Sequence, residues 1–313
     1  MKAIRKHIFA LLLAGAMPAL ASAADCELTI TTLPVEQPNP IPEAVNDMLM
    51  TRLSSVLSRT GVETGYGFSQ FFITGKFNDY YSDVVPGPPK SFALHTQLTL
   101  YVGDILNQST YATCGFELRG VGTSDQRAFI NAMSGINANN PKLEKFIDDA
   151  KVKIIDYYDK NYPNILDKAR QASAMRNYEE ALMYSTSIPE CSKGYAEATE
   201  ATLSIYQAYI DYEGRMLLTA AQGAWAADPD RKGAVAAYGY LRQIDPNASC
   251  FAEAQKLMNE IKTVVKENWD FDHKQKYLDE INLKLQMINA AREVGVAYGS
   301  HQQPQTTNLM WLK

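Results

Sequence analysis

The chain has 313 residues, of which 46% are hydrophobic and 21% are charged, a balance typical of a globular protein with a substantial core. This composition excludes a disordered chain, and 18 glycines and 14 prolines exclude a collagen-like one. With 30 basic and 35 acidic residues the net charge is −5, so no basic surplus indicates nucleic-acid binding. The length allows one large domain or two ordinary ones.

The N-terminus has the pattern of a secretory signal peptide over residues 1–23. Basic residues come first, an apolar stretch over 8–20 follows, and Ala21-Ser22-Ala23 supplies small residues for cleavage after Ala23. The apolar stretch is short for a membrane span and rich in alanine, although an uncleaved anchor is the alternative. Cleavage removes three basic residues and no acidic one, which changes the net charge from −5 to −8.

The predicted destination is the periplasm or the outside of the cell. Asp25 precedes Cys26, where a lipoprotein signal needs a small residue, so no lipid anchor is expected. The remaining chain has no second stretch that resembles a membrane span, and we expect none after cleavage.

Strand-like alternation dominates the first half of the mature chain. A helix over 45–57 lies between Pro42 and Gly61, and Thr123 with Gln126 predicts a capping box. The predicted strands cover 26–33, 68–77, 92–102 and 111–121, and the later helices cover 124–135 and 141–158. The order β-α-β-β-β-α-α predicts an α+β domain over 24–160, with an antiparallel or mixed sheet.

The second half keeps only helical periodicity, which predicts an all-α domain over 161–298. Asp228-Pro229-Asp230 is expected to separate two of its helices. The longer predicted helices cover 195–227, 234–244, 251–265 and 272–298, after short ones around 169–184. Residues 299–313 form a polar tail with an apolar end.

Two similar stretches recur about 56 residues apart in the second half. Each has a short Ala/Tyr helix that ends near a proline, and an aromatic-Ala-Glu-Ala run then starts the next helix. Residues 177–182 resemble the first helix of a tetratricopeptide repeat, and residues 245–248 resemble the turn after one. The resemblance covers 165–262 and implies a helical-repeat domain; a plain helical bundle is the alternative.

The first domain resembles, in its order of elements, the small α+β domains of periplasmic accessory proteins. These include the curli secretion channel subunit and the lipoprotein activators of penicillin-binding proteins. Gly120-Val121-Gly122 leads from a strand into a helix that contains alanine, and the resemblance is based on this strand-to-helix transition. The family lipobox is absent, and no site residue follows from the likeness.

Four cysteines, Cys26, Cys114, Cys191 and Cys250, lie in the mature chain. An even number in an exported protein predicts two disulfides, with three possible connectivities. Pairing within each domain predicts Cys26–Cys114 and Cys191–Cys250, and free buried thiols are the alternative. There is no CxxC motif and no zinc-site spacing, so no metal site or cofactor is predicted.

Catalytic motifs are missing from the sequence. It has no HExxH, GxSxG or P-loop, and Asp125 stands where a dinucleotide fingerprint needs its third glycine. Asp270 and Asp272 suit a helix cap better than a calcium loop, because Lys274 takes a ligand position. His95 is expected on a polar sheet face. No catalytic residue is therefore assigned.

Tyrosine is abundant, with 18 in the chain. Its apolar ring and polar hydroxyl suit binding surfaces, and helical repeats bind partners on such surfaces. Tyr206, Tyr209 and Tyr238 are the candidates for an inner binding face, and Trp225 lies on the same predicted helix as Tyr206 and Tyr209. Helix–helix packing with the hydroxyl at the edge is the alternative, and the sequence favours it.

Together these patterns predict an exported, non-enzymatic interaction or accessory protein of the bacterial envelope, whose partner is an unknown envelope protein or peptide. A glycan- or nutrient-binding protein is the alternative, followed by a hydrolase with a site at the domain junction.

Overall fold

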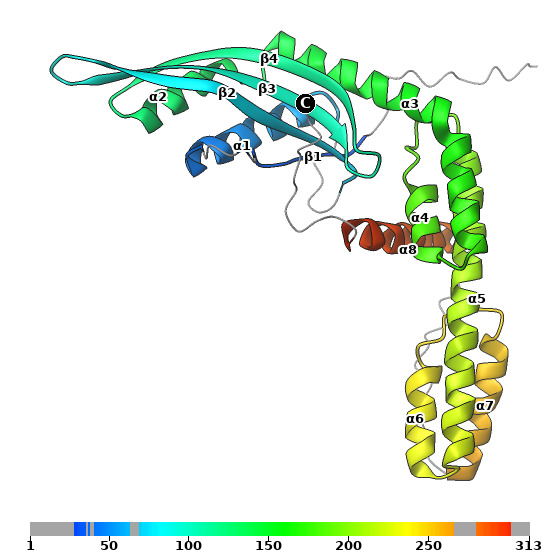
Figure 1. Ribbon diagram of the computed structural model, residues 1–313. Coiled ribbons are helices and arrows are strands. Elements are labelled where there is room, and N and C mark those ends of the chain that lie inside the picture. The colour runs from blue at the N-terminus through cyan, green and yellow to red at the C-terminus, as the bar shows by residue number, and fades with distance from the viewer. Residues whose placement is uncertain (1–27, 36, 38–40, 63–68, 266–279, 302–313) are drawn as a thin grey trace, which may run out of the picture.

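The computed structural model describes residues 28–35, 37, 41–62, 69–265 and 280–301. Within these ranges, a sheet-containing N-terminal region is followed by a mainly helical region, as the sequence predicted at this level (Figure 1). No helix in the described ranges is long and apolar enough to cross a membrane. The predicted signal peptide with its cleavage site at Ala23, Cys26, and residues 302–313 of the predicted tail lie outside these ranges.

Four strands form one mixed sheet in the order β1-β2-β3-β4. The short β1 pairs with β2 in parallel, whereas β2, β3 and β4 form antiparallel pairs. Their bounds are β1 Ile30–Thr32, β2 Phe71–Val85, β3 Ser91–Asp104 and β4 Ser109–Gly122. The strand predicted to end at residue 77 continues to Val85, because β3 pairs with it as far as Ser91. The extended β2–β3 hairpin projects beyond the helices (Figure 1).

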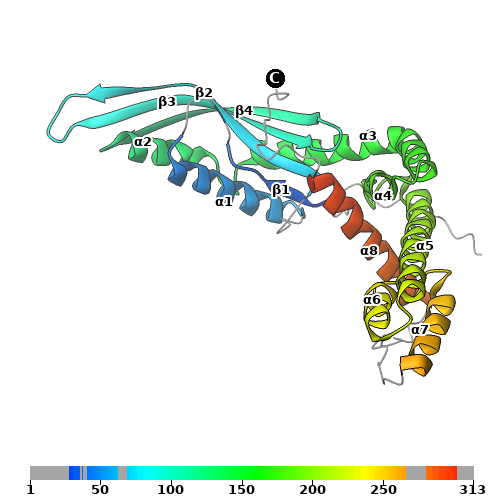
Figure 2. The ribbon, with the colours of Figure 1, turned by 60° about the horizontal axis from the view of Figure 1, so that its bottom comes forward.

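Helices pack on one face of this sheet and enclose the first core (Figure 2). They are α1 Glu43–Arg59, α2 Asp125–Ala132 and α3 Pro141–Ala174, with the short 3-10 helix η2 Met133–Gly135 after α2. Leu98 and Leu100 of β3 are fully buried there, as is Leu53 of α1. The cap of α2 differs from the prediction: α2 begins at Asp125, so Ser124 rather than Thr123 accepts the N–H of Arg127.

One continuous helix joins the two regions. Because α3 runs from Pro141 to Ala174, the predicted helix end at Tyr158 is wrong, and the expected domain boundary near residue 160 falls inside α3. An internal proline costs about 3 kcal/mol by removing a hydrogen bond and crowding the preceding turn. Buried residues on both sides of Pro163, Tyr158 and Leu166, offset this cost through their packing. The helix bends on its way out of the sheet region (Figure 1).

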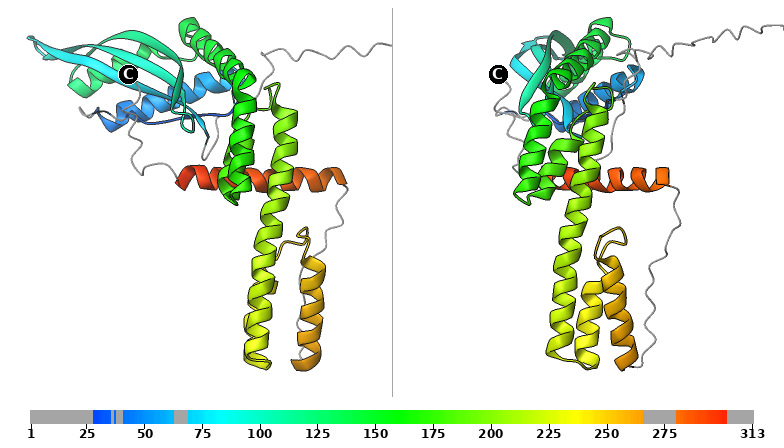
Figure 3. Two further views of the ribbon diagram at one scale, coloured as in Figure 1. Left: turned by 45° about the vertical axis from the view of Figure 1, so that its right-hand side comes forward. Right: turned by 90° about the vertical axis from the view of Figure 1, so that its right-hand side faces the viewer.

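The helical region is organised along the 33-residue helix α5. Its helices are α4 Tyr178–Thr186, α5 Tyr195–Ala227, α6 Arg231–Leu241, α7 Phe251–Val265 and α8 Glu280–His301. The end of α3 together with α4 and α8 packs on the first half of α5, and α6 with α7 packs on its second half (Figure 3). The bounds of α5 and α7 confirm the predicted ones. Residues 299–301, expected in the tail, belong to α8.

Candidate functional site

Tyrosines from α4 and α5 gather where these two helices meet. Tyr178 lies at the start of α4, and its ring centroid is 6.2 Å from that of Tyr209 and 5.7 Å from that of Tyr212. Tyr206 continues the contacts, with its centroid 6.2 Å from that of Tyr209. Tyr206 and Tyr209 were predicted from the sequence, whereas Tyr178 and Tyr212, which complete the group, were not.

The tyrosines differ in their access to solvent. Tyr206 is only 8% exposed and packs in the core between α3, α4, α5 and α8. Tyr178, Tyr209 and Tyr212 are half-buried, and these three define what we call the tyrosine surface. Tyr209, Tyr212 and Met216 lie three and four residues apart and so follow one face of α5. Met216 is 57% exposed, which extends the surface toward solvent.

Arg176 places a positive charge on the tyrosine surface. Its guanidinium carbon lies 5.5 Å from the centroid of the Tyr212 ring, within the range of a cation–π contact. Arg176 stands in the turn between α3 and α4, where its φ of 64° is left-handed. Such positions after a helix favour glycine or asparagine. The chain therefore has an arginine at a position whose backbone conformation does not favour this residue.

Carboxylates lie near the hydroxyls of Tyr209 and Tyr206. Burial raises the pKa of Tyr209, and the charges of Glu213 and Glu179 raise it further. The pKa of Tyr206 rises to about 12, mainly through burial and then through Asp245. Glu179 and Glu213 are exposed, and no ion pair joins either of them to another residue in the described part of the chain. The tyrosine surface is therefore bordered by two carboxylates without an ion-pair partner in the described part of the chain, and Arg176 lies over the surface itself.

Tyr238 and Trp225 do not join the tyrosine surface. Both pack at the edge of the separate core formed by α6, α7 and the second half of α5. The predicted grouping of Tyr238 with Tyr206 and Tyr209 on one face is therefore wrong, because helical periodicity does not show which helices meet. The spacing of Tyr209, Tyr212 and Met216 on one face of α5 was a sequence signal that could have identified Tyr212.

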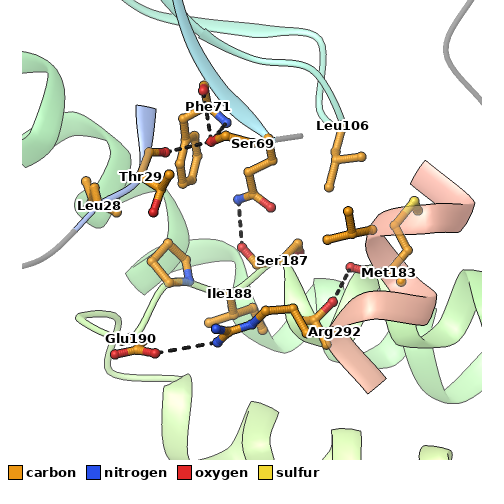
Figure 4. A pocket seen from close by; sticks show the side chains of 15 residues that line it. Leu28, Thr29, Ser69, Phe71, Leu106, Met183, Ser187, Ile188, Glu190 and Arg292 are labelled. Carbon is orange, nitrogen blue, oxygen red and sulfur yellow. Dashed lines mark hydrogen bonds and ion pairs between the residues drawn. The ribbon is translucent and has the colours of Figure 1, made fainter. Parts of the chain in front are cut away.

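A cavity of about 290 Å³ lies where the sheet region meets α4 and α8 (Figure 4). Glu190 and Arg292 form an ion pair at 3.5 Å in its wall, and both side chains are about half exposed. Gln70, directly before β2, donates to the carbonyl of Ser187 at 2.8 Å and so links the start of the strand to the chain after α4. The full wall of the cavity is formed by Leu28, Thr29, Ser69, Gln70, Phe71, Leu106, Met183, Thr186, Ser187, Ile188, Pro189, Glu190, Arg292, Gly295 and Val296.

A buried carboxylate, Asp104, fixes the sheet end beside this cavity. One of its oxygens accepts the backbone N–H groups of Leu106 and Asn107. The other accepts the hydroxyls of Tyr158, at 2.7 Å, and Tyr111, together with the side-chain amide of Asn107. Burial raises the pKa of Asp104, although these hydrogen bonds act in the opposite direction. Tyr158 also receives Gln70, so the network connects β3, α3 and the cavity wall.

The structure does not form the two predicted disulfides. Cys114 and Cys250 are free thiols, which rules out both Cys26–Cys114 and Cys191–Cys250. Cys191 packs near the start of α5 against the first core, whereas Cys250 packs beside Gly214 in the second. The part of α5 between these places is about 28 Å long at 1.5 Å per residue, far beyond the reach of a disulfide. Cys191 is disulfide-bonded, but its partner is neither Cys114 nor Cys250.

His95 lies on the sheet face opposite α1 and α2, as expected. Its ring centroid is 5.4 Å from that of Tyr81, and Gln97 and Glu117 are near it.

No group of three or more His, Cys, Asp or Glu side chains suited to a metal ion occurs among the described residues. The buried carboxylate Asp104 has all its partners within the protein, and Glu190 is paired with Arg292.

Comparison with known protein families, with characterised proteins and with solved structures gives no match. The arrangement of side chains is suited to binding at the tyrosine surface or in the cavity.

Proposed function

We propose that this chain is an exported, non-enzymatic interaction protein of the bacterial envelope, which binds a partner protein through its helical region. The tyrosine surface carries this proposal. Its three rings are half-buried, so they are held in place by α4 and α5 and still reach solvent. Rigid aromatic side chains with a polar tip are enriched in protein interfaces, and the exposed Met216 adds an adaptable apolar contact.

The two helix pairs support a repeat-like binding architecture. The helices α5 and α7 begin 56 residues apart, at Tyr195 and Phe251. Residues at the same separation are buried in both pairs, Ala181 with Ala237 and Ile188 with Ile244. Stacked helix pairs of this kind present extended binding surfaces. The tetratricopeptide likeness and the accessory role of the N-terminal domain remain part of the proposal.

Site-specific cross-linking tests the proposal. A photoreactive amino acid replaces Met216 in the full chain, which is expressed in the cells of origin. We expect one discrete adduct that is lost when Tyr209→Ala and Tyr212→Ala are added, because the tyrosines hold the partner against α5. The matched control places the same photoreactive group at Val264, which is 60% exposed on α7. Identical adducts at both positions, or none at Met216, would contradict the proposal.

Binding of a glycan or nutrient is a second candidate, favoured by the junction cavity. Its volume of about 290 Å³ is close to the lower limit of small-molecule sites. Hydroxyl, amide and guanidinium groups line it beside Phe71 and Leu106. A protein acting only in this way needs no partner at Met216, so the cross-linking experiment separates the two candidates.

A further inference from the structure

We infer that the tyrosine surface recognises a basic segment of its partner, with an arginine or lysine side chain stacked on Tyr212 or Tyr209 and paired with Glu179 and Glu213. This inference rests on the proposed interaction function and adds the chemistry of the partner. Three independent features of the surface lead to it.

The first feature is that the surface already holds a cation. The guanidinium of Arg176 lies over Tyr212 at 5.5 Å, although Arg176 is exposed and its left-handed backbone favours a smaller residue. The tyrosine face is therefore attractive to a guanidinium in this geometry. The Tyr209 ring extends the aromatic area, with its centroid 6.2 Å from those of both Tyr178 and Tyr206 in tilted arrangements.

The second feature is the charge around the rings. Glu213 lies one turn after Tyr209 on α5, and Glu179 lies next to Tyr178 on α4, and both act on the Tyr209 hydroxyl. Within the described residues neither carboxylate has a basic partner. An acidic segment would meet like charge here, whereas a basic one gains two ion pairs.

The third feature is apolar area beside the charges. Met216 is 57% exposed one turn after Tyr212, and Met175, next to Arg176, is 66% exposed. Arginine and lysine carry long aliphatic stems that cover apolar surface while the charged end stays with carboxylates. Apolar, aromatic and acidic groups in one place thus match an amphipathic basic segment better than a purely polar ligand.

Peptide binding tests this directly. The probe is a synthetic amphipathic peptide with arginines on its polar face, and two counterparts carry glutamine or glutamate at those positions. Fluorescence anisotropy with the full chain is expected to show binding of the arginine peptide that weakens with salt, and weaker binding of both counterparts. The double variant Glu179→Gln/Glu213→Gln is expected to reduce affinity about tenfold, the sum of two exposed ion pairs.

Two further variants sharpen the result. Arg176→Gly suits the left-handed backbone and removes the competing cation, so it is expected to tighten binding of the arginine peptide about threefold. The matched control is Glu260→Gln, an exposed glutamate on α7, which should leave affinity unchanged.

The charge inference is overturned if the glutamine and arginine peptides bind equally, or if the double glutamate variant binds as wild type. The glutamate peptide or a neutral sugar binding more tightly would overturn it as well. An adduct at Met216 that survives Glu179→Gln/Glu213→Gln refutes the basic partner alone, whereas the absence of any adduct refutes the interaction function itself.

Discussion

At the scale of single residues, Asp104 shows how burial and hydrogen bonding oppose each other. Five donors reach its carboxylate, from Leu106, Asn107, Tyr111 and Tyr158. They favour the charged form, whereas complete burial favours the protonated form, and burial dominates because the pKa is raised. The donors come from the β3–β4 turn, from β4 and from α3, so one side chain ties three elements together.

Asp104→Asn is expected to destabilise the protein by about 2 kcal/mol, because the new amide N–H groups oppose the donors of Asn107 and the tyrosines. In wild type, the raised pKa means that the folded state binds more protons than the unfolded state above pH 3.8. The unfolding free energy of wild type should therefore fall as pH rises from 3.8 through the raised pKa. In Asp104→Asn this pH dependence should be absent, because asparagine does not titrate.

Urea denaturation over a pH series measures both effects. Asp149→Asn is the control, since Asp149 is half exposed and pairs only with Lys145 on the helix surface. A wild-type free energy that rises over this pH interval relative to Asp104→Asn would refute the assignment.

Predictions for single residues were correct where the residues lie on one helix. They failed where residues come together only through the packing of distant segments. Tyr206 and Tyr209 were identified because both lie on α5, but Tyr178 reaches them only through the packing of α4. Tyr238 was grouped with them by composition, yet it packs against the separate core of α6, α7 and the second half of α5. The predicted disulfides failed for the same reason, since nothing local places Cys250 beside Gly214.

At the scale of elements, the sequence predicted those helices whose ends carry strong signals. The bounds of α5 follow from Asp228-Pro229-Asp230, which ends it, and α6 starts with Asp230 as its cap. The end of α3 was predicted wrongly at Tyr158, because packing on both sides of Pro163 continues the helix to Ala174. The outer part of β2 lacks alternation and is exposed, so only its pairing with β3 defines it.

The contact of α2 with β4 depends on a glycine. A Cβ atom at Gly120 would lie 2.0 Å from the carbonyl oxygen of Ala128, a backbone atom that cannot move aside. Gly120→Ala is therefore expected to destabilise the protein by about 3 kcal/mol through overpacking. Gly115→Ala in the same strand is the matched control, because its nearest neighbour would be the Gln97 side chain at 3.5 Å.

Chemical denaturation of the two variants gives the comparison. A similarly large loss of unfolding free energy in both variants would mean that the strand structure of β4 does not tolerate alanine. A small loss of unfolding free energy in both would mean that α2 can shift away from the sheet.

At the scale of the whole molecule, α5 belongs to two cores. Its first half packs with α3, α4 and α8, and its second half packs with α6 and α7 around Leu218, Leu241 and Ile261. Figure 3 shows the second group extending away from the sheet. Because few apolar contacts connect this end to the rest, it should open as a local unit with its own free energy. The tyrosine surface lies near the middle of α5 and is joined to the sheet-bearing part through Tyr178 of α4.

Leu241→Ala tests this division. Leu241 is fully buried in the second core, so its truncation should cost about 3 kcal/mol of local stability. Hydrogen exchange followed by mass spectrometry should then show faster exchange in α6, α7 and the end of α5, with β3 unchanged. Leu98→Ala, at an equally buried position of β3, should instead accelerate exchange across the sheet and α1. If Leu241→Ala accelerates exchange in β3 as strongly as in α6, the two cores unfold together and binding at the tyrosine surface would depend on both.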